Sequence, residues 1–497
     1  MRILLFLLSL LTAASSFAAT GTWNSPAIGR ALKYTTSAAS VSAAKDANGK
    51  LMTIIYLENL GVARVGTVSN AENVKWLCSQ GYQVIELDYE DSELAVLPTL
   101  NADIIAINKS LKEGSFCGST CSPSRSYILM EGYRIQRDIS YYHDDPTVYN
   151  FPDVYKDSDG DELFLDLIYP ASPAVAVPVI ITFSYSNSYA TNSSSGKLTN
   201  ANKHMRMNLY NFWGNFNDSF VEGASAAGFA WVVCDHPKYC EWGQGRYTGG
   251  GNKSLGAIEV NPDTRRKVRS AIRTVRALGR PLGLNGDVAV TGFSRASTAA
   301  ALAVGDGDTN DTEDTRGRFY EEDCHVQCAL LGPGIFDYEH ALPASNEYTR
   351  MNTFIKATSS SWQEQGALST IKTSTSAPTL FYYNADDYFK DNNKNPQGLY
   401  ATQASLMKAA LDAVGAPTAT LTNYSSGHAV PQSAAALQTM YDFLFEHIAV
   451  PDPTGISAVT SSSATSSSAV LYDLLGRRAT PSYKGFIIRN GRLHFNR

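Results

Sequence analysis

Apolar runs and helical periodicity alternate along most of this chain. The runs VPVIITF (177–183) and FAWVVCD (229–235) are apolar at nearly every position, which is typical of strands buried on both faces of a parallel sheet. Residues 264–278 instead place apolar side chains at every third or fourth position, with arginine and lysine facing away, as in an amphipathic helix. Buried strands that alternate with helices predict an α/β fold with a mostly parallel central sheet.

Residues 20–125 are interpreted as an N-terminal α/β extension. Between residues 52 and 108, the segments MTIIYLENL, YQVIELDY and DIIAIN are predicted strands, and residues 71–81 are a predicted helix that ends in glycine. A βαβ series implies parallel pairing. No glycine-rich phosphate loop follows the strands, so no nucleotide site is expected. The extension is either a small domain or a set of extra strands on the main sheet.

Residues 126–450 are expected to form the main domain. It opens with two antiparallel strands, YILMEGYRIQRDISYY and DELFLDLIYP, ahead of the buried parallel strands. Its last part contains the strands APTLFYY (377–383) and ATLTNY (419–424) and a final helix over residues 431–447.

The N-terminus has the pattern of a secretory signal peptide, assigned here to residues 1–19. A basic start is followed by an apolar run and then by small residues up to Ala18 and Ala19, near which cleavage is expected. The apolar run is shorter than the roughly 20 residues that span a bilayer, and no other segment reaches that length. We therefore predict export and no transmembrane segment.

The C-terminus combines a linker with a small β module. Residues 451–469 are a Ser/Thr-rich, low-complexity linker, and residues 470–497 contain short β-like runs around Gly476 and the hairpin signal Asn490-Gly491. The runs LYDL, GRR, KG and IIRNG in this tail resemble the C-terminal sorting domain of the type IX secretion system. That resemblance implies export through the periplasm of a Gram-negative bacterium to the cell surface or the medium, with the secretion machinery as a partner.

Composition and charge exclude several classes of protein. Of 497 residues, 44% are hydrophobic and 18% charged, which excludes a mainly disordered chain or a fibre. The net charge of −6 favours neither DNA nor RNA as a partner. Seven cysteines suit an oxidising compartment, and the odd number leaves at least one thiol free, with the isolated Cys78 as the candidate. The cysteine spacings fit zinc fingers poorly, and neither a metal nor another cofactor is implied.

Residues 292–297, GFSRAS, contain the most informative motif. The pattern G-x-S-x-A follows the predicted strand 287–291 and opens an alanine-rich helix, which is the context of a nucleophile elbow. The turn is so tight that the residues two positions away from Ser294 must be small, as Gly292 and Ala296 are. We interpret Ser294 as a nucleophile held at a helix N-terminus, where the helix dipole favours developing negative charge.

An acid and a base follow in the order that this motif requires. The strand 377–383 is followed by Asn384-Ala385-Asp386-Asp387; Asp387 is the favoured acid and Asp386 the alternative. His428, in the Gly-His that follows the last strand, is the favoured base. Of the eight histidines, it alone has both the order and the loop context.

Residues 126–450 resemble the alpha/beta-hydrolase superfamily, with a three-layer fold. The resemblance implies a triad in which His428 takes the Ser294 proton and Asp387 orients the imidazole. It also implies an oxyanion hole made by backbone N–H groups, which we assign to Arg295 and Tyr185. The loop at Tyr185 lacks the His-Gly-Gly of many esterases, so the second donor stays open.

Two further features bear on the substrate. Ser294-Arg295 is similar to the G-C-S-R-x-G-K elbow of glucuronoyl esterases, whose arginine helps to stabilise the oxyanion, although Phe293 replaces the cysteine. Trp213, in an aromatic cluster, and Trp242 are candidate substrate-binding platforms, with core packing as the alternative.

These expectations combine into a secreted serine esterase. It would cleave carboxylic esters through an acyl-serine intermediate, with acetyl or feruloyl groups on plant polysaccharide as the expected substrate class. The alternatives are a peptidase of the prolyl-oligopeptidase type and a catalytically silent glycan-binding member of the fold. The segment before residue 126 is too short and too helical for the β-propeller of such a peptidase, and an intact Ser, Asp and His argue against a silent module.

Overall fold

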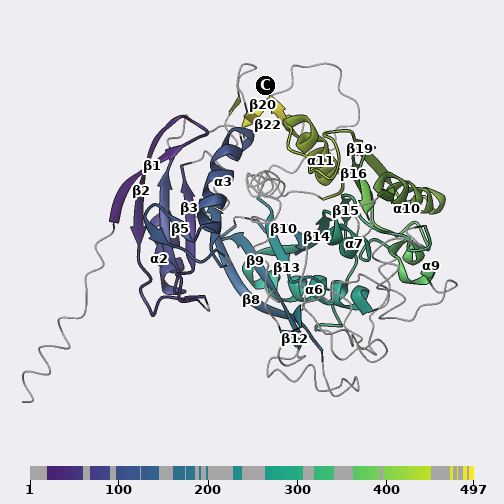
Figure 1. Cartoon of the computed structure of the whole chain (residues 1–497), viewed down its shortest axis with the longest axis horizontal. Coiled ribbons are helices and arrows are strands. Elements are labelled where there is room, and N and C mark those ends of the chain that lie inside the picture. The colour runs from purple at the N-terminus through teal and green to yellow at the C-terminus, as the bar shows by residue number, and fades with distance from the viewer. Residues whose placement is uncertain are drawn as a thin grey trace, which may run out of the picture.

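The protein is described by a computed structural model (Figure 1). The described residues are 19–46, 48–59, 68–89, 97–123, 125–144, 161–173, 175–184, 190–191, 198–199, 228–237, 263–305, 318–340, 362–390, 396–448, 471–473, 478–479, 485–489 and 492–496.

An eight-stranded sheet forms the centre of the molecule, in the order β19-β16-β15-β14-β10-β13-β9-β8. Strand β9 is antiparallel to both of its neighbours, and all the other neighbouring pairs are parallel. The mixed α/β class with a mostly parallel sheet is thereby confirmed. The strands are β8 (Tyr133–Asp144), β9 (Asp161–Pro170), β10 (Val177–Phe183), β13 (Ala230–Cys234), β14 (Leu284–Gly292), β15 (Cys328–Leu331), β16 (Thr379–Tyr383) and β19 (Thr418–Thr422).

Both faces of this sheet are covered, because alternate residues of its central strands belong to two different apolar cores. One core joins alternate strand residues such as Ile180 to helix α11 (Ala434–His447). The other joins the intervening residues to three helices on the opposite face. Those helices are α6 (Asp263–Gly279), α7 (Arg295–Ala301) and α10 (Tyr400–Val414). The near-continuous apolar runs of the sequence follow from this two-sided burial.

The N-terminal part forms a separate five-stranded sheet, in the order β1-β2-β4-β3-β7, coloured purple to blue in Figure 1. Strand β3 pairs in parallel with β4 and β7, while β1 and β2 add antiparallel pairs. The elements are β1 (Ala19–Ser25), β2 (Arg30–Ser37), β3 (Thr53–Glu58), α2 (Asn70–Ser79), β4 (Gln83–Asp88), α3 (Leu97–Lys112) and β7 (Tyr127–Met130).

Two sequence expectations for this part were wrong. The segment DIIAIN was expected to be a strand, but it lies inside α3, where Ile104, Ile107 and Leu111 are buried at helical spacing. The third parallel strand is instead β7, which was expected to open the main domain. The chain therefore passes from the N-terminal sheet to the main sheet at residues 131–132, a few residues after the expected domain boundary at residue 126.

A buried carboxylate of the main sheet, Asp166, joins the two sheets. Asp166 of β9 lies 3.8 Å from the guanidinium of Arg137 on β8, and their side chains are 0% and 6% exposed. Tyr127 of β7 donates a hydrogen bond to Asp166, and the backbone N–H of Asp138 donates another at 2.9 Å. The Arg137 guanidinium also lies 4.8 Å from the centre of the Tyr127 ring. The N-terminal sheet is thus attached to the main sheet through a carboxylate that has several partners.

Replacing Asp166 by alanine is expected to destabilise the protein by about 3–5 kcal/mol, because it leaves the Arg137 charge buried without its carboxylate. Urea unfolding followed by far-UV circular dichroism measures the change. Lys408→Ala is the control: it removes an exposed pair with Asp412 and should cost no more than about 0.5 kcal/mol. Equal losses in the two variants would contradict the assigned role of Asp166.

The carboxyl edge of the N-terminal sheet gathers acidic side chains. Glu58, at the end of β3, lies near Glu86, Glu131 and Asp88, and burial followed by these negative charges raises its pKa from 4.5 to about 7. The folded protein therefore binds a proton on Glu58 more tightly than the unfolded chain does. The resulting contribution to stability is complete below about pH 4.5 and is lost as the pH rises through about 7.

Glu58→Gln should flatten this pH dependence, because glutamine stays neutral. Between about pH 5 and about pH 8, the unfolding free energy of the variant should fall less than that of the natural protein. Urea unfolding at the two pH values measures both changes, and Glu113→Gln at an exposed position controls for the loss of one charge. The same pH dependence in all three proteins would contradict the prediction.

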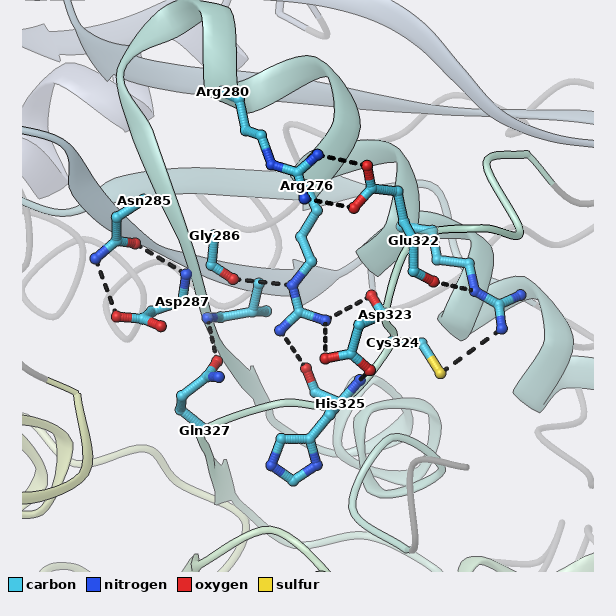
Figure 2. A network of polar contacts seen from close by, with 12 residues as sticks. Arg276, Arg280, Asn285, Gly286, Asp287, Glu322, Asp323, Cys324, His325 and Gln327 are labelled. Atoms are coloured by element: carbon cyan, nitrogen blue, oxygen red, sulfur yellow. Dashed lines mark hydrogen bonds and ion pairs between the residues drawn. The ribbon is translucent and has the colours of Figure 1, made fainter. Parts of the chain in front are cut away.

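At the amino edge of the main sheet, a polar network sets the alignment of β14 and β15 (Figure 2). Arg276 of α6 is 5% exposed and donates to the carbonyl of Gly286 at 2.9 Å and to the carbonyls of Asp323 and His325. The side-chain oxygen of Gln327 accepts the N–H of Val288 at 2.6 Å. This network holds α6, β14 and the segment before β15 together, and at the far ends of these strands Gly292 pairs with Leu331.

The expected features at the chain ends fall mostly outside the described residues. The predicted signal peptide is outside them except for Ala19, which begins β1, and the linker 451–469 is outside them altogether. In the tail, β20 (Leu471–Asp473), β21 (Arg478–Ala479), β22 (Gly485–Arg489) and β23 (Arg492–Asn496) form an antiparallel sheet. Among the described helices, none has the length and hydropathy to cross a membrane.

Four of the described cysteines are thiols. Cys78, Cys117 and Cys121 of the N-terminal part and Cys328 of β15 form no disulfide, and Cys240 lies outside the described residues. Burial raises the pKa of the Cys78 thiol to about 11, so this side chain is an unreactive core group.

Candidate active site

Strand β14 ends in a sharp turn at Ser294. This residue has φ 57° and ψ −127°, a backbone conformation that residues other than glycine rarely adopt. Helix α7 begins at the next residue. Ser294 as a whole residue is 6% exposed. The strand–turn–helix predicted around the GFSRAS motif is therefore present, with Ser294 at its bend.

The tightness of this turn accounts for the small residues beside Ser294. A Cβ atom on Gly292 would lie 2.4 Å from the backbone carbonyl of Ala296 and 2.5 Å from the N–H of Ser297. The carbonyl of Gly292 accepts hydrogen bonds from the Tyr382 hydroxyl at 2.6 Å and from the N–H of Gly332 at 2.9 Å. The strained turn is thus held by β16, through Tyr382, and by the residue that directly follows β15.

Asp387 and His428 lie together at the same edge of the sheet. Asp387 follows β16 and His428 follows β19, and Oδ2 of Asp387 is 2.8 Å from Nδ1 of His428. The Asp387 side chain is 1% exposed, whereas that of His428 is 26% exposed. A buried carboxylate on Nδ1 leaves Nε2, the other ring nitrogen, to receive a proton from a nucleophile.

Asp386, the alternative acid, has a different partner. Its Oδ1 accepts the backbone N–H of Gly427 at 2.8 Å. The loop of His428 is also held by Tyr424, whose hydroxyl donates to the carbonyl of Ala429 at 2.8 Å. Burial and then the negative charge of Asp387 raise the pKa of Tyr424, so its hydroxyl remains a donor.

Two aromatic rings flank the His428 imidazole. The Phe293 ring lies 4.7 Å from it, centre to centre, and the Tyr400 ring stacks on it at 5.2 Å. Because Phe293 directly precedes Ser294, its contact places the imidazole beside the turn at Ser294. Sequence reasoning missed Tyr400, the first residue of α10; an aromatic residue that opens the helix after the acid loop was the available signal.

The predicted oxyanion donors are described only in part. Arg295 is the first residue of α7, where backbone N–H groups are not used by the hydrogen bonds of the helix itself. Tyr185 lies one residue beyond the described end of the segment that contains β10. Trp213 and Trp242, the predicted substrate platforms, also lie outside the described residues.

The same edge of the sheet carries a second cluster that sequence reasoning missed. Asp337, Glu339 and His340 follow β15, and their ligand atoms lie within 4.8 Å of one another. Asp337 is buried and contacts His340 through Oδ2 and Nδ1, while the other two residues are exposed. Within the described part of the chain, this is the group of three such residues whose ligand atoms lie close enough together to share a cation.

Comparison with known proteins gives structural neighbours only. No model of a known protein family matches the sequence, and no curated protein matches it. A truncated carbohydrate esterase from gut microbiota is 17% identical over 64% of this chain and 97% of its own, with a TM-score of 0.41. A bifunctional GH43-CE protein of Bacteroides eggerthii is 16% identical over 63% of this chain and 38% of its own, with a TM-score of 0.41. A propionate-bound esterase of the planctomycete Thermogutta terrifontis is 17% identical over 64% of this chain and 94% of its own, with a TM-score of 0.39. At these values the likeness carries no information about the substrate or mechanism of this chain.

Gly292→Ala is expected to abolish the geometry of the Ser294 turn, since the added Cβ would meet backbone atoms that cannot rotate away. The loss of stability should exceed about 3 kcal/mol, in the range seen for overpacking and backbone strain combined. Gly286→Ala, in the same strand, is the control: its φ of +91° is strained, but no atom lies within 4 Å of the new Cβ. The control should cost only about 1–2 kcal/mol by thermal unfolding. A Gly292→Ala protein as stable as the control would show that the turn is less tight than described.

Proposed function

We propose that this protein is a serine hydrolase of the alpha/beta-hydrolase fold, with Ser294 as nucleophile, His428 as base and Asp387 as acid. The observation that carries the proposal is the buried Asp387 carboxylate on Nδ1 of His428, beside the strained turn that holds Ser294. Support comes also from the strand order, in which nucleophile, acid and base follow β14, β16 and β19 at one edge of a parallel sheet.

In the proposed reaction, the Ser294 hydroxyl attacks an acyl carbon while Nε2 of His428 takes its proton. Asp387 keeps the ring in the correct tautomer and stabilises the imidazolium that forms. The negative oxygen of the tetrahedral intermediate would accept the N–H of Arg295 and a second N–H, assigned to Tyr185; one such donor is worth about 3–4 kcal/mol. His428 then protonates the leaving alcohol, and water attacks the acyl-serine by the reverse sequence of proton transfers.

Carboxylic esters are the proposed substrates. Acetyl or feruloyl groups on plant polysaccharide are the proposed targets, because the signals predicted at both chain ends would place the enzyme outside the cell. Trp213 and Trp242 are proposed to contact the sugar or aryl part of the substrate, and no cofactor is required. The prolyl-oligopeptidase alternative gains no support from the N-terminal part, where a five-stranded α/β sheet stands in place of a propeller.

Labelling with a fluorophosphonate probe tests the proposal. The natural protein is expected to gain one adduct by intact mass, and Ser294→Ala none, because only a serine activated by a base attacks the probe readily. Ser294→Ala should also lower the hydrolysis of p-nitrophenyl acetate by at least about 10³-fold. Acetylated xylan and feruloylated arabinoxylan then compare the acyl groups.

Ser297→Ala is the matched control for this labelling. Ser297 lies one helical turn away and donates to the carbonyl of Gly332 at 2.8 Å, so its removal should leave the adduct in place. A folded natural protein that gains no adduct would overturn the hydrolase proposal and favour the silent, glycan-binding alternative.

A further inference from the structure

The two loops that carry the acid and the base are tied to each other by side chains of the acid loop. Asn384 donates through Nδ2 to the carbonyl of Gly427 at 2.9 Å and accepts the N–H of Ser425 through Oδ1 at 3.0 Å. Asp386 accepts the N–H of Gly427 at 2.8 Å. The N–H and the C=O of Gly427, the residue directly before the base, are therefore both held by residues of the acid loop.

Gly427 is the point at which the loop direction is set. Its φ is +60°, in the region that glycine adopts readily, and the chain turns there into His428. Glycine is conformationally free, so the hydrogen bonds to the N–H and the C=O of Gly427 are needed to fix its backbone. They thereby fix the position from which the His428 imidazole projects. The imidazole is then aligned by two contacts from different sides, the Asp387 carboxylate and the Phe293 ring beside Ser294.

The two holding residues differ in burial. Asn384 is fully buried, so its removal would leave buried polar groups without partners and would weaken the fold. Asp386 is exposed, and its carboxylate contributes one charge-assisted hydrogen bond to the base loop. Asp386 can therefore be changed with little expected effect on folding.

We propose that Asp386 is a positioning residue for the base. Its carboxylate fixes the Gly427 N–H, and through it the His428 ring, while the adjacent Asp387 orients and stabilises the ring directly. Of the two consecutive aspartates, Asp386 thus positions the loop and Asp387 orients the ring. This inference rests on the proposed serine hydrolase function and assigns Asp386 no contact with the substrate.

The test compares Asp386→Ala with Asp386→Asn in the full-length protein. For p-nitrophenyl acetate, alanine is expected to lower kcat by about 10-fold to 100-fold with KM within about 2-fold, because a misplaced base slows the chemical step rather than binding. The rate of fluorophosphonate labelling at Ser294 should fall in parallel. Asparagine keeps an oxygen acceptor at the same position and should restore kcat to within about 3-fold of the natural protein.

The control is Asp287→Ala at the opposite edge of the same sheet, where Asp287 accepts one exposed hydrogen bond from Asn285 at 3.0 Å (Figure 2). It should leave kcat unchanged, and all variants should melt within a few degrees of the natural protein. Asp386→Ala with the natural kcat would overturn the proposal. Asp386→Asn as slow as the alanine variant would overturn it too, since the charge and not the hydrogen bond would then matter. Failure of the hydrolase proposal itself has a different signature, a natural protein that neither labels nor turns over the ester.

Discussion

The candidate site depends on one close approach of backbone to backbone, between the end of β14 and the start of α7. Gly292 lies so near to Ala296 and Ser297 that no side chain fits between them, and the chain reverses at Ser294 in a strained conformation. Such strain persists only where the surroundings over-determine it. Here Tyr382 of β16 and Gly332, directly after β15, both hold the Gly292 carbonyl, so the turn is supported by the interior of the sheet.

Parallel pairing places the remaining site residues at the same edge. The strands β14, β15, β16 and β19 run in one direction, so the loops after them all emerge at their carboxyl ends. Ser294, Asp387 and His428 come from three of these loops, although they are far apart in sequence. The polar network around Arg276 lies at the amino ends and maintains the register there, away from the chemistry.

The His428 imidazole is held by two kinds of interaction with different physical roles. Asp387 accepts a hydrogen bond from Nδ1 of the ring. Asp386 accepts the N–H of Gly427 and Asn384 donates to its carbonyl, so the loop sets the direction of the ring. The rings of Phe293 and Tyr400 pack against it, with centres 4.7 Å and 5.2 Å away. The ring stays partly exposed while its Nδ1 side is buried against Asp387, which fits the role as base proposed above.

The sequence by itself determined the α/β class, most strand positions and the order of serine, acid and histidine, because buried parallel strands and a tight elbow impose local residue patterns. It misassigned DIIAIN, since an apolar hexapeptide fits a strand and a buried helix equally well. It also left Asp386 and Asp387 open as the acid. Only the tertiary structure gave each a separate partner, Gly427 for one and His428 for the other, because hydrogen bonds between loops depend on the register of β16 and β19. The attachment of the N-terminal sheet through Asp166, Arg137 and Tyr127 likewise follows from contacts between distant segments, for which a single sequence carries no local signal.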